Sequence, residues 1–175
     1  MKLLLKIFII IFFFSNSSNL LLAENNIAYL DLDYVLSKSN SGSSLLKQLN
    51  EIEQKNIKIL SLKEDELKKE ENEIKKIKNI ISKNELEKKI QQLKVKLNSY
   101  NKLRNENIKI FKERRKVEVL RYMNLINPII EKYMNNQSID ILLDKKNIFI
   151  AKVDYDITQK IIDIIDKEIK DFKIK

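Results

Sequence analysis

The sequence has no cysteine and no histidine, and only one glycine and one proline among its 175 residues. Without cysteine and histidine there are no disulfides and no thiol chemistry, and the usual near-neutral proton carrier and the common zinc ligands are missing. A fold with many short elements needs the tight turns that glycine and proline supply, whereas long helices need few. Aromatic residues make up only 7% of the chain, which is little material for a single globular core. The composition therefore predicts an elongated, mainly helical protein.

Two acidic pairs are the remaining candidates for a chemical site. Asp31 and Asp33 stand two residues apart, as do Asp154 and Asp156, and this spacing is compatible with a metal site. In each pair, however, one aspartate is expected to end a strand and the other to cap a helix, which explains both without a metal. We therefore expect no catalytic residue, no metal site, no cofactor and no enzymatic activity.

The first 23 residues, MKLLLKIFIIIFFFSNSSNLLLA, have the layout of a secretory signal peptide. Lys2 and Lys6 form a positive n-region, an apolar core follows, and Ala23 precedes the expected cleavage site. The alternative is an uncleaved membrane anchor, but the apolar run is short against the roughly 20 residues that span a bilayer. We expect export and cleavage after Ala23, which leaves a mature chain of residues 24–175.

The mature chain opens with a predicted strand. Residues 27–32 place Ala28, Leu30 and Leu32 on one face, as a half-buried strand does. Asp33 is then expected to cap a short helix, because its carboxylate can accept a free N–H of the first turn. The next stretch, SKSNSGSS, holds the only glycine and is typical of a loop.

From Ser43 onward, apolar residues recur at spacings of three and four, which predicts a long helix with a coiled-coil stripe. Polar residues interrupt this stripe at Asn56, Lys63 and Glu70, so the predicted seam is weak and the arm can flex. The stripe consists of Leu45, Leu49, Ile52, Leu60, Leu67, Ile74, Ile77 and Ile81.

The helical pattern breaks at Ser82, which together with Glu85 matches a capping box. A second apolar stripe then runs from Leu86 to Met134. Two long helices joined by a few residues pack antiparallel, so we predict a helical hairpin whose tip lies near residues 80–84. The alternative is one continuous rod that dimerises, which the capping box and the loss of heptad register argue against. Pro128 is expected to kink or locally break the return helix.

The end of the chain changes character at IDILLDKKNIFIAKVDYDIT. Residues 139–143 and 148–151 are predicted to form two strands, with Asp144–Asn147 as the turn between them. Asp156 is expected to cap a final amphipathic helix. A two-stranded hairpin is not stable alone, so the strand at residues 27–32 is expected to join it.

The two chain ends should thus close into one small α/β body, formed by residues 24–42 and 128–175. The arm, residues 43–127, projects from this body. The residues expected to build the body are Ile27, Leu30, Leu32, Ile139, Ile141, Leu143, Ile148 and Ile150. Because the sheet is incomplete in one chain, assembly of several copies is favoured.

These end segments carry a resemblance to a known family. IAYLDLDYVLSKSNSGSSLLKQL and IDILLDKKNIFIAKVDYDITQKIIDII resemble the two halves of the OmpH/Skp family of periplasmic chaperones, chiefly at Asp140, Asp144 and Asp156-Ile157-Thr158. The helical middle matches only in composition and period. One departure is the link Asn135–Ser138, where a glycine is often found, although asparagine tolerates the left-handed backbone that a helix end favours.

The resemblance implies a jellyfish-shaped homotrimer in the periplasm. Three end segments would assemble a trimerising α/β body, and three helical hairpins would extend from it around a cavity. The implied function is that of an ATP-independent holdase, which binds unfolded outer-membrane proteins and prevents their aggregation. The competing hypothesis is a structural coiled-coil protein of the envelope that holds no client.

The net charge of +9 admits three interpretations. Lysine and glutamate alternate at helical spacing along much of the chain, which is typical of a solvated helix face. Nucleic-acid binding is disfavoured by the predicted export and by the lack of aromatic residues among the lysines. The third interpretation is attraction of anionic clients, or of lipid or lipopolysaccharide headgroups. The residues expected to face the client or anion are Arg104, Lys109, Lys112, Arg114, Arg115, Lys116 and Arg121.

Overall fold

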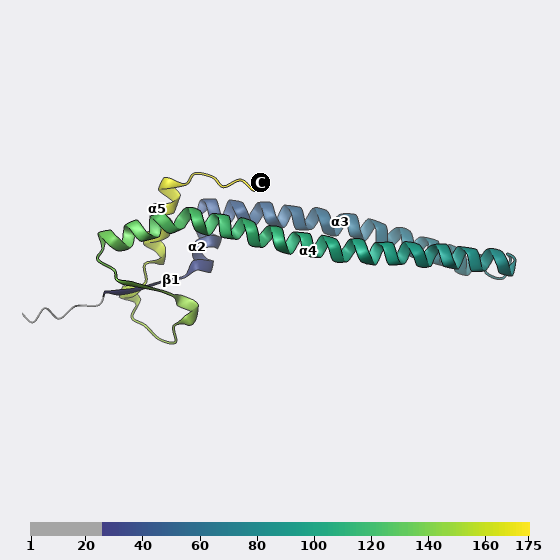
Figure 1. Ribbon diagram of the computed structural model, residues 1–175, viewed down its shortest axis with the longest axis horizontal. Helices are drawn as coiled ribbons and strands as arrows, with labels where there is room; N and C mark the ends of the chain where they lie inside the picture. Colours follow the sequence, from purple (N-terminus) through teal and green to yellow (C-terminus); the bar gives the residue numbers. More distant parts are fainter. Residues whose placement is uncertain (1–25) are drawn as a thin grey trace, which may run out of the picture.

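A computed structural model of the chain describes residues 26–175, in which a long two-helix arm projects from a smaller body (Figure 1). The predicted signal peptide and its cleavage site lie outside the described residues. The mainly helical fold with one small strand pair confirms the coarse fold class predicted from the sequence. Among the helices described between residues 26 and 175, none is long and apolar enough to cross a membrane.

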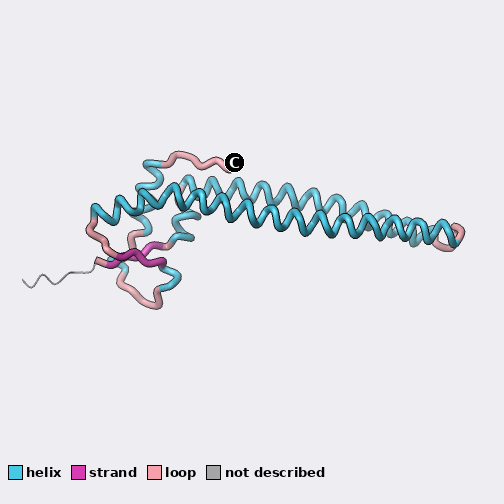
Figure 2. The backbone as a smooth tube through the Cα atoms, viewed as in Figure 1, coloured by secondary structure: helices cyan, strands magenta, loops and turns pink. Residues whose placement is uncertain are grey.

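The arm consists of α3 (Asn40–Ile77) and α4 (Lys83–Asn136), which lie side by side and join at the end far from the body (Figures 1 and 2). The 38 residues of α3 correspond to a length of roughly 57 Å. Because the chain reverses at residues 78–82, the two helices run antiparallel. Both ends of the arm therefore return to the same body.

The predicted capping box begins α4. The Oγ atom of Ser82 accepts a hydrogen bond from the Glu85 N–H at 3.3 Å, and Oε2 of Glu85 accepts one from the Ser82 N–H at 3.2 Å. Hydrogen bonds from the hydroxyl and then the backbone of Ser82 hold the pKa of Glu85 below its ordinary value. The reciprocal bonds fix where the return helix starts.

The predicted break at Pro128 is wrong, because α4 runs through this residue without interruption. A proline in a helix interior removes one N–H donor and costs about 3 kcal/mol. Ile126, Ile129 and Ile130 are buried on either side of it and belong to the core of the body. Most helical stability comes from such packing, which here outweighs the local preference.

The body contains a parallel sheet of β1 (Ile27–Leu30) and β2 (Ile141–Asp144), paired so that Ile27 faces Ile141. The predicted hairpin with residues 148–151 is wrong, since these residues form no strand in the described chain. The carboxylate of Asp144 accepts the Lys146 N–H at 3.2 Å and starts a 3-10 turn that leads the chain away from β2.

The other edge of β1 is touched by the segment that precedes the last helix. Tyr29 forms an isolated parallel bridge with Asp156, after a second 3-10 turn at Val153–Tyr155. The N–H of Ile157 donates to the carbonyl of Tyr29 at 3.0 Å. Both partners of β1 therefore come from the end of the chain, as the predicted closure of the two ends requires.

The link between α4 and β2 takes its left-handed residue at Ser138, with φ of 53°, and not at an asparagine. The N–H of Ile139 donates to the carbonyl of Met134 at 2.9 Å, and the N–H of Ser138 to the carbonyl of Asn135 at 3.3 Å. This pair of bonds is the Schellman motif, which satisfies the last carbonyls of a helix. The helix end is thus preserved without glycine.

The helix that follows β1 begins two residues earlier than predicted. Asp31, and not Asp33, caps α2 (Leu32–Lys38) by accepting the Tyr34 N–H at 2.9 Å. The predicted loop SKSNSGSS shrinks to a break at Ser39, whose Oγ donates to the carbonyl of Val35 at 2.7 Å. That residue ends α2 and caps α3 at once.

Gly42 lets α3 pass close to the end of α2. A Cβ atom at this position would overlap the carbonyl oxygen of Leu36 and lie 2.7 Å from Oγ of Ser39. Glycine is needed here for a close approach, not for an unusual backbone conformation.

The last helix, α5 (Thr158–Glu168), packs Ile161, Ile162 and Ile165 into the core. Asp156 stands one position before the cap residue, yet its carboxylate accepts the Thr158 N–H at 2.9 Å, so it serves the helix start as expected. Burial raises the pKa of Asp156, but the hydrogen bonds from Thr158 and the nearby Lys145 ammonium outweigh burial and keep this pKa below its ordinary value.

Candidate functional site

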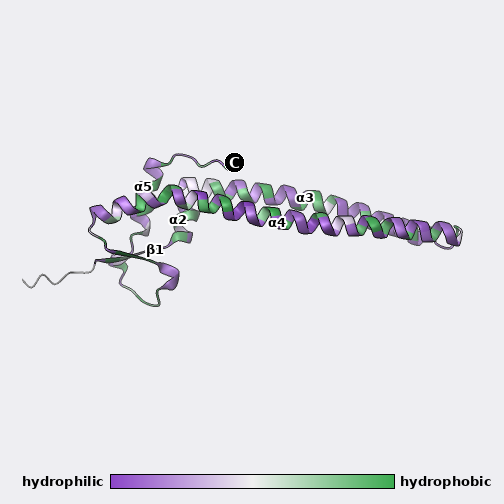
Figure 3. Cartoon of the chain, viewed as in Figure 1, coloured by the Kyte–Doolittle hydropathy of each residue, from purple (hydrophilic) through white to green (hydrophobic). Residues whose placement is uncertain are grey.

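The arm buries its apolar residues at the base and exposes them farther out. Leu45 and Leu49 belong to the core cluster, whereas between residues 50 and 117 only Ile74 and Leu93 are buried apolar residues. Hydrophobic and hydrophilic residues alternate along the ribbons of both arm helices in Figure 3. The exposed large apolar residues of this part, here called the arm apolar set, are Ile57, Ile59, Leu62, Ile80, Ile90, Val95, Leu97, Ile108, Ile110 and Val117.

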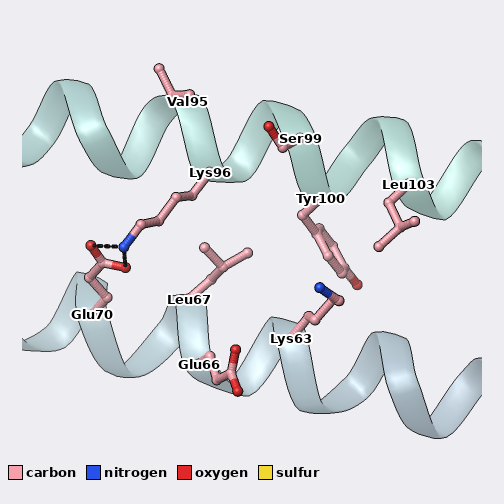
Figure 4. A pocket seen from close by; sticks show the side chains of 9 residues that line it. All are labelled: Lys63, Glu66, Leu67, Glu70, Val95, Lys96, Ser99, Tyr100 and Leu103. Atoms are coloured by element: carbon pink, nitrogen blue, oxygen red, sulfur yellow. Dashed lines mark hydrogen bonds and ion pairs between the residues drawn. The ribbon is translucent and has the colours of Figure 1, made fainter.

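In the outer half of the arm, α3 and α4 enclose a groove of about 370 Å³ (Figure 4). Leu67 points from α3 toward α4, and Tyr100 points from α4 toward α3. The ammonium of Lys96 crosses to both carboxylate oxygens of Glu70, at 2.8 and 2.7 Å. The groove thus combines apolar side chains such as Leu67 and Tyr100 with the Lys96–Glu70 ion pair, and it can take up an apolar side chain of a bound polypeptide.

The three polar residues predicted to interrupt the stripe take different places. Asn56 is half-buried, and Lys63 is exposed and lines the groove. Glu70 forms the ion pair with Lys96. An exposed ion pair contributes at most about 1 kcal/mol, less than a buried leucine would, so the seam at these positions is weak.

The rim of the groove carries a second charged group. The ammonium of Lys68 lies 2.8 Å from a carboxylate oxygen of Glu64, and the hydroxyl of Tyr100 donates to the same carboxylate at 3.2 Å. The hydrogen bond and the charge of Lys68 lower the pKa of Glu64, and the carboxylate in turn raises the pKa of Lys68. Both groups are therefore ionised throughout the neutral range.

The basic residues predicted to face an anion all lie on α4, but they have different surroundings. Arg104, Lys109, Lys112, Arg115 and Lys116 are exposed, and none has an ion pair within 4.0 Å in the described part of the chain. Arg114 donates to the carbonyl of Lys175 at 2.9 Å. Arg121 binds the buried carboxylate of Glu118 and the carbonyl of Lys173. Two of the seven predicted residues, Arg114 and Arg121, thus bind main-chain carbonyls in the last residues of the chain.

The residues predicted to build the body fall into three groups. Leu30 is fully buried, and Leu32, Ile139 and Ile148 are half-buried. The others are exposed, namely Ile27, Ile141, Leu143 and Ile150. Ile27 and Ile141 are partners in the sheet register, so one face of the strand pair presents apolar side chains to solvent.

Part of the exposed apolar surface is not predicted by any sequence pattern. Phe149 is completely exposed, and Val153 and Tyr155 are exposed in the same segment. Their signal was the density of apolar residues in a stretch between β2 and α5 that no helical or alternating pattern covers. Together with Ile150 they form what we call the body loop, residues 148–155.

Comparisons with known proteins agree with this layout. The profile of the family described as outer membrane protein (OmpH-like) matches residues 26–165. Among solved structures, the chain is similar to a protein from Caulobacter crescentus CB15 described as an OmpH-like outer membrane chaperone, at 20% sequence identity with a TM-score of 0.74. The match covers 85% of this chain and 88% of that chain, and it shows a shared fold.

No curated protein matches the chain significantly. The family profile, however, covers β1, the whole arm, β2 and most of α5. It spans most of the sequence, including both end segments on which the resemblance rested. The protein therefore belongs to the OmpH-like family.

Proposed function

We propose that this protein is an ATP-independent periplasmic holdase chaperone. Its clients are unfolded outer-membrane proteins, which it holds between helical arms and keeps from aggregating on their way to the outer membrane. Membership of the OmpH-like family supports a chaperone role, and the predicted signal peptide supports export.

The observation that carries this proposal is the arm apolar set. Ile57, Ile108 and Ile110, for example, are 52%, 43% and 66% exposed. They lie on helices whose shared seam is weakly packed. A strand of a β-barrel precursor has apolar residues at every second position, and these need cover before the barrel forms. Many weak contacts spread over several arms hold such a chain by avidity, while each single contact still releases quickly.

We further propose that three copies assemble through the body. In this proposal the assembling body is residues 24–42 and 128–175, which include the ends of α3 and α4 nearest the body, and the projecting arm is residues 43–127, with its tip near residues 80–84. A two-stranded sheet with an exposed apolar face is marginal in water, and the body loop exposes Phe149, Ile150 and Val153 in addition. The trimeric state itself comes from the resemblance to the OmpH/Skp family.

The exposed cations of α4 add a long-range electrostatic attraction to the proposed function. Arg104, Lys109, Lys112, Arg115 and Lys116 have no anionic partner within 4.0 Å in the described chain. Unpaired charges of one sign attract acidic partners and raise the rate of encounter. We propose that they draw in anionic clients, or lipid or lipopolysaccharide headgroups.

The function is tested by diluting an outer-membrane barrel protein from urea into buffer with the mature protein. We expect light scattering to be suppressed at about three subunits per client chain, the ratio that a trimer sets. Replacing Ile57, Ile59 and Leu62 together with serine should markedly weaken the suppression, because these exposed residues contribute contact and not folding. A matched variant with serine at Lys55 and Lys58 should retain it.

Scattering as rapid as in buffer alone would contradict the holdase. In that case the structural coiled-coil hypothesis would be favoured. Circular dichroism of each variant checks that the helical content is unchanged.

Assembly is tested by replacing Phe149 and Ile150 with serine. Burying each of these side chains stabilises an interface by about 1.5–3 kcal/mol, so the double variant is expected to sediment as a monomer at micromolar concentration. Lys152→Ser, in the same loop, should leave the trimer intact. Sedimentation of the unmodified mature chain as a monomer across this range would refute the proposed assembly.

A further inference from the structure

The chain continues past α5 as an extended segment without helix or strand, residues 169–175, here called the strap. In Figure 1 this segment leads from α5 back along the base of the arm to the end marked C. It lies beyond residue 165, where the match to the family profile ends.

The strap is held through its main chain. From α3, Nε2 of Gln48 donates to the carbonyl of Phe172 at 2.6 Å, and Oε1 of the same side chain accepts the N–H of Ile174 at 3.1 Å. One amide side chain thus bonds two main-chain groups two residues apart, as a neighbouring strand would. Such bonds recognise an extended backbone whatever its side chains are.

Residues of α4 complete this recognition from the other side. The guanidinium of Arg114 donates to the carbonyl of Lys175 at 2.9 Å, and Oε1 of Glu118 accepts the Lys175 N–H at 3.1 Å. Arg121 donates to the carbonyl of Lys173. The strap is therefore held between side chains of α3 and side chains of α4, and we call the place that it occupies the strap groove, hereafter the groove.

The side chains of the strap alternate between the groove and solvent. Phe172 is 4% exposed, and its ring meets the ring of Tyr122 edge-on at 5.5 Å between centroids. The guanidinium carbon of Arg121 lies 4.2 Å from the centroid of the Phe172 ring. Ile174 is half-buried, whereas Lys173 between them is exposed. The groove thus selects an aromatic residue followed, two positions later, by an aliphatic one.

The groove also has internal bonds that do not depend on the strap. Gln48 donates to the carbonyl and the hydroxyl of Ser44, at 3.2 Å each. The carboxylate of Glu118, which is almost completely buried, is bound twice by Arg121, at 2.9 and 2.6 Å. We expect these bonds to keep the polar side chains of the groove oriented when the strap leaves.

We propose that this groove is a peptide-binding site and that the strap is its resident occupant. The partner is an extended segment of an unfolded polypeptide with an aromatic residue and, two positions later, an aliphatic one, the alternation found in a β-strand. This inference rests on the proposed function, since the holdase supplies such segments. Because the strap is tethered at an effective concentration on the order of millimolar, only a segment that is held in place by the arms displaces it.

The first test measures binding of a fluorescent peptide with the strap sequence, IKDFKIK, by anisotropy. The mature chain and a chain that ends at Glu168 are compared. We expect the shortened chain to bind the peptide at least about tenfold more tightly, because its groove has no tethered competitor. The same peptide with alanine in place of Phe172 should bind much more weakly. Equal binding by the two chains, or no effect of the phenylalanine, would overturn the proposal.

A second variant keeps the whole chain and so avoids any loss of folding. Since the chain has no cysteine, Ser44→Cys with Asp171→Cys can lock the strap, because Oγ of Ser44 lies 3.0 Å from Oδ1 of Asp171. The oxidised protein should not bind the peptide, and reduction should restore binding. Lys173→Ala, at the exposed position of the strap, is the matched control and should behave as the unmodified chain.

The same locked variant separates this inference from the proposed function. If the oxidised and reduced forms suppress client aggregation equally and bind the peptide equally, the groove is not a binding site while the holdase remains. If the unmodified chain fails to suppress aggregation, the holdase fails, and with it the role of the groove for clients.

Discussion

Replacing Gly42 with valine is expected to lower the free energy of unfolding by about 3 kcal/mol or more, and replacing it with alanine by about 1–2 kcal/mol. A Cβ atom would overlap the Leu36 carbonyl oxygen and approach its carbon to 2.9 Å. This carbonyl belongs to the last turn of α2 and cannot rotate away as a side chain could.

Two effects oppose each other in the alanine variant. Alanine gains up to about 1 kcal/mol over glycine inside a helix, whereas overpacking a tight contact costs about 1–3 kcal/mol. Because the overlap at Gly42 is with backbone atoms, the second effect should win. Valine adds two methyl groups at the same place, so its loss is larger.

The measurement is chemical denaturation of the mature chain at one fixed protein concentration, since assembly makes stability depend on concentration. Ser43→Ala, one residue farther along α3 and exposed, is the matched control and should stay within about 0.5 kcal/mol of the unmodified chain. Equal stability of Gly42→Ala and Ser43→Ala would show that α2 and α3 do not meet as closely as described.

Replacing Tyr122 with alanine is expected to lower the free energy of unfolding by about 3–5 kcal/mol. The side chain is fully buried where α3, α4 and the strap meet. Its hydroxyl lies 2.7 Å from Oγ of Ser39 and 3.3 Å from Oγ of Ser41. The alanine variant removes the ring from the core and leaves the hydroxyl of Ser41 without its partner.

Tyr122→Phe separates the two contributions. It keeps the ring, so we expect a loss of only about 1 kcal/mol, the usual net value of one hydrogen bond. Leu120→Ala, on the exposed side of α4, is the control and should change stability by less than about 1 kcal/mol. A loss in Tyr122→Phe as large as in Tyr122→Ala would mean that the hydrogen bonds, and not the packing of the ring, hold the arm base.

The features that local chemistry determines could be predicted from the sequence. The capping box at Ser82 and Glu85 depends on residues three positions apart, and its bonds form as expected. The long apolar stripes likewise predict helices, because their period is a property of the local chain. The distinction between Asp31 and Asp33 was missed, because both stand where a strand gives way to a helix and both can cap one.

The pairing of distant segments could not be read from the sequence. Residues 139–151 contain two β-like runs around a polar turn, the usual signal for a hairpin. The run at residues 141–144 pairs instead with β1, from which the two arm helices separate it in the sequence. The uninterrupted helix at Pro128 could not be predicted for the same reason. The burial of the neighbouring isoleucines, which stabilises the helix there, depends on tertiary structure.

The candidate site was predictable only in outline. The stripe pattern indicates which residues are apolar, but not that Ile90 and Leu97 stay 50% and 41% exposed while Leu93 between them is covered. The basic run on α4 was visible, but the roles of Arg114 and Arg121 depend on a segment that is more than 50 residues away in the chain.

The parallel pairing of Ile27 with Ile141 has a kinetic consequence. Contacts between segments so far apart in the sequence form slowly, because the closure of a long loop is entropically unfavourable. The arm lowers this entropic barrier. Its two helices pack antiparallel, each turn next to one already packed, and so bring β2 back close to β1. We therefore expect the arm helices to form before the sheet closes, so that the arm brings together the two strands of its own body.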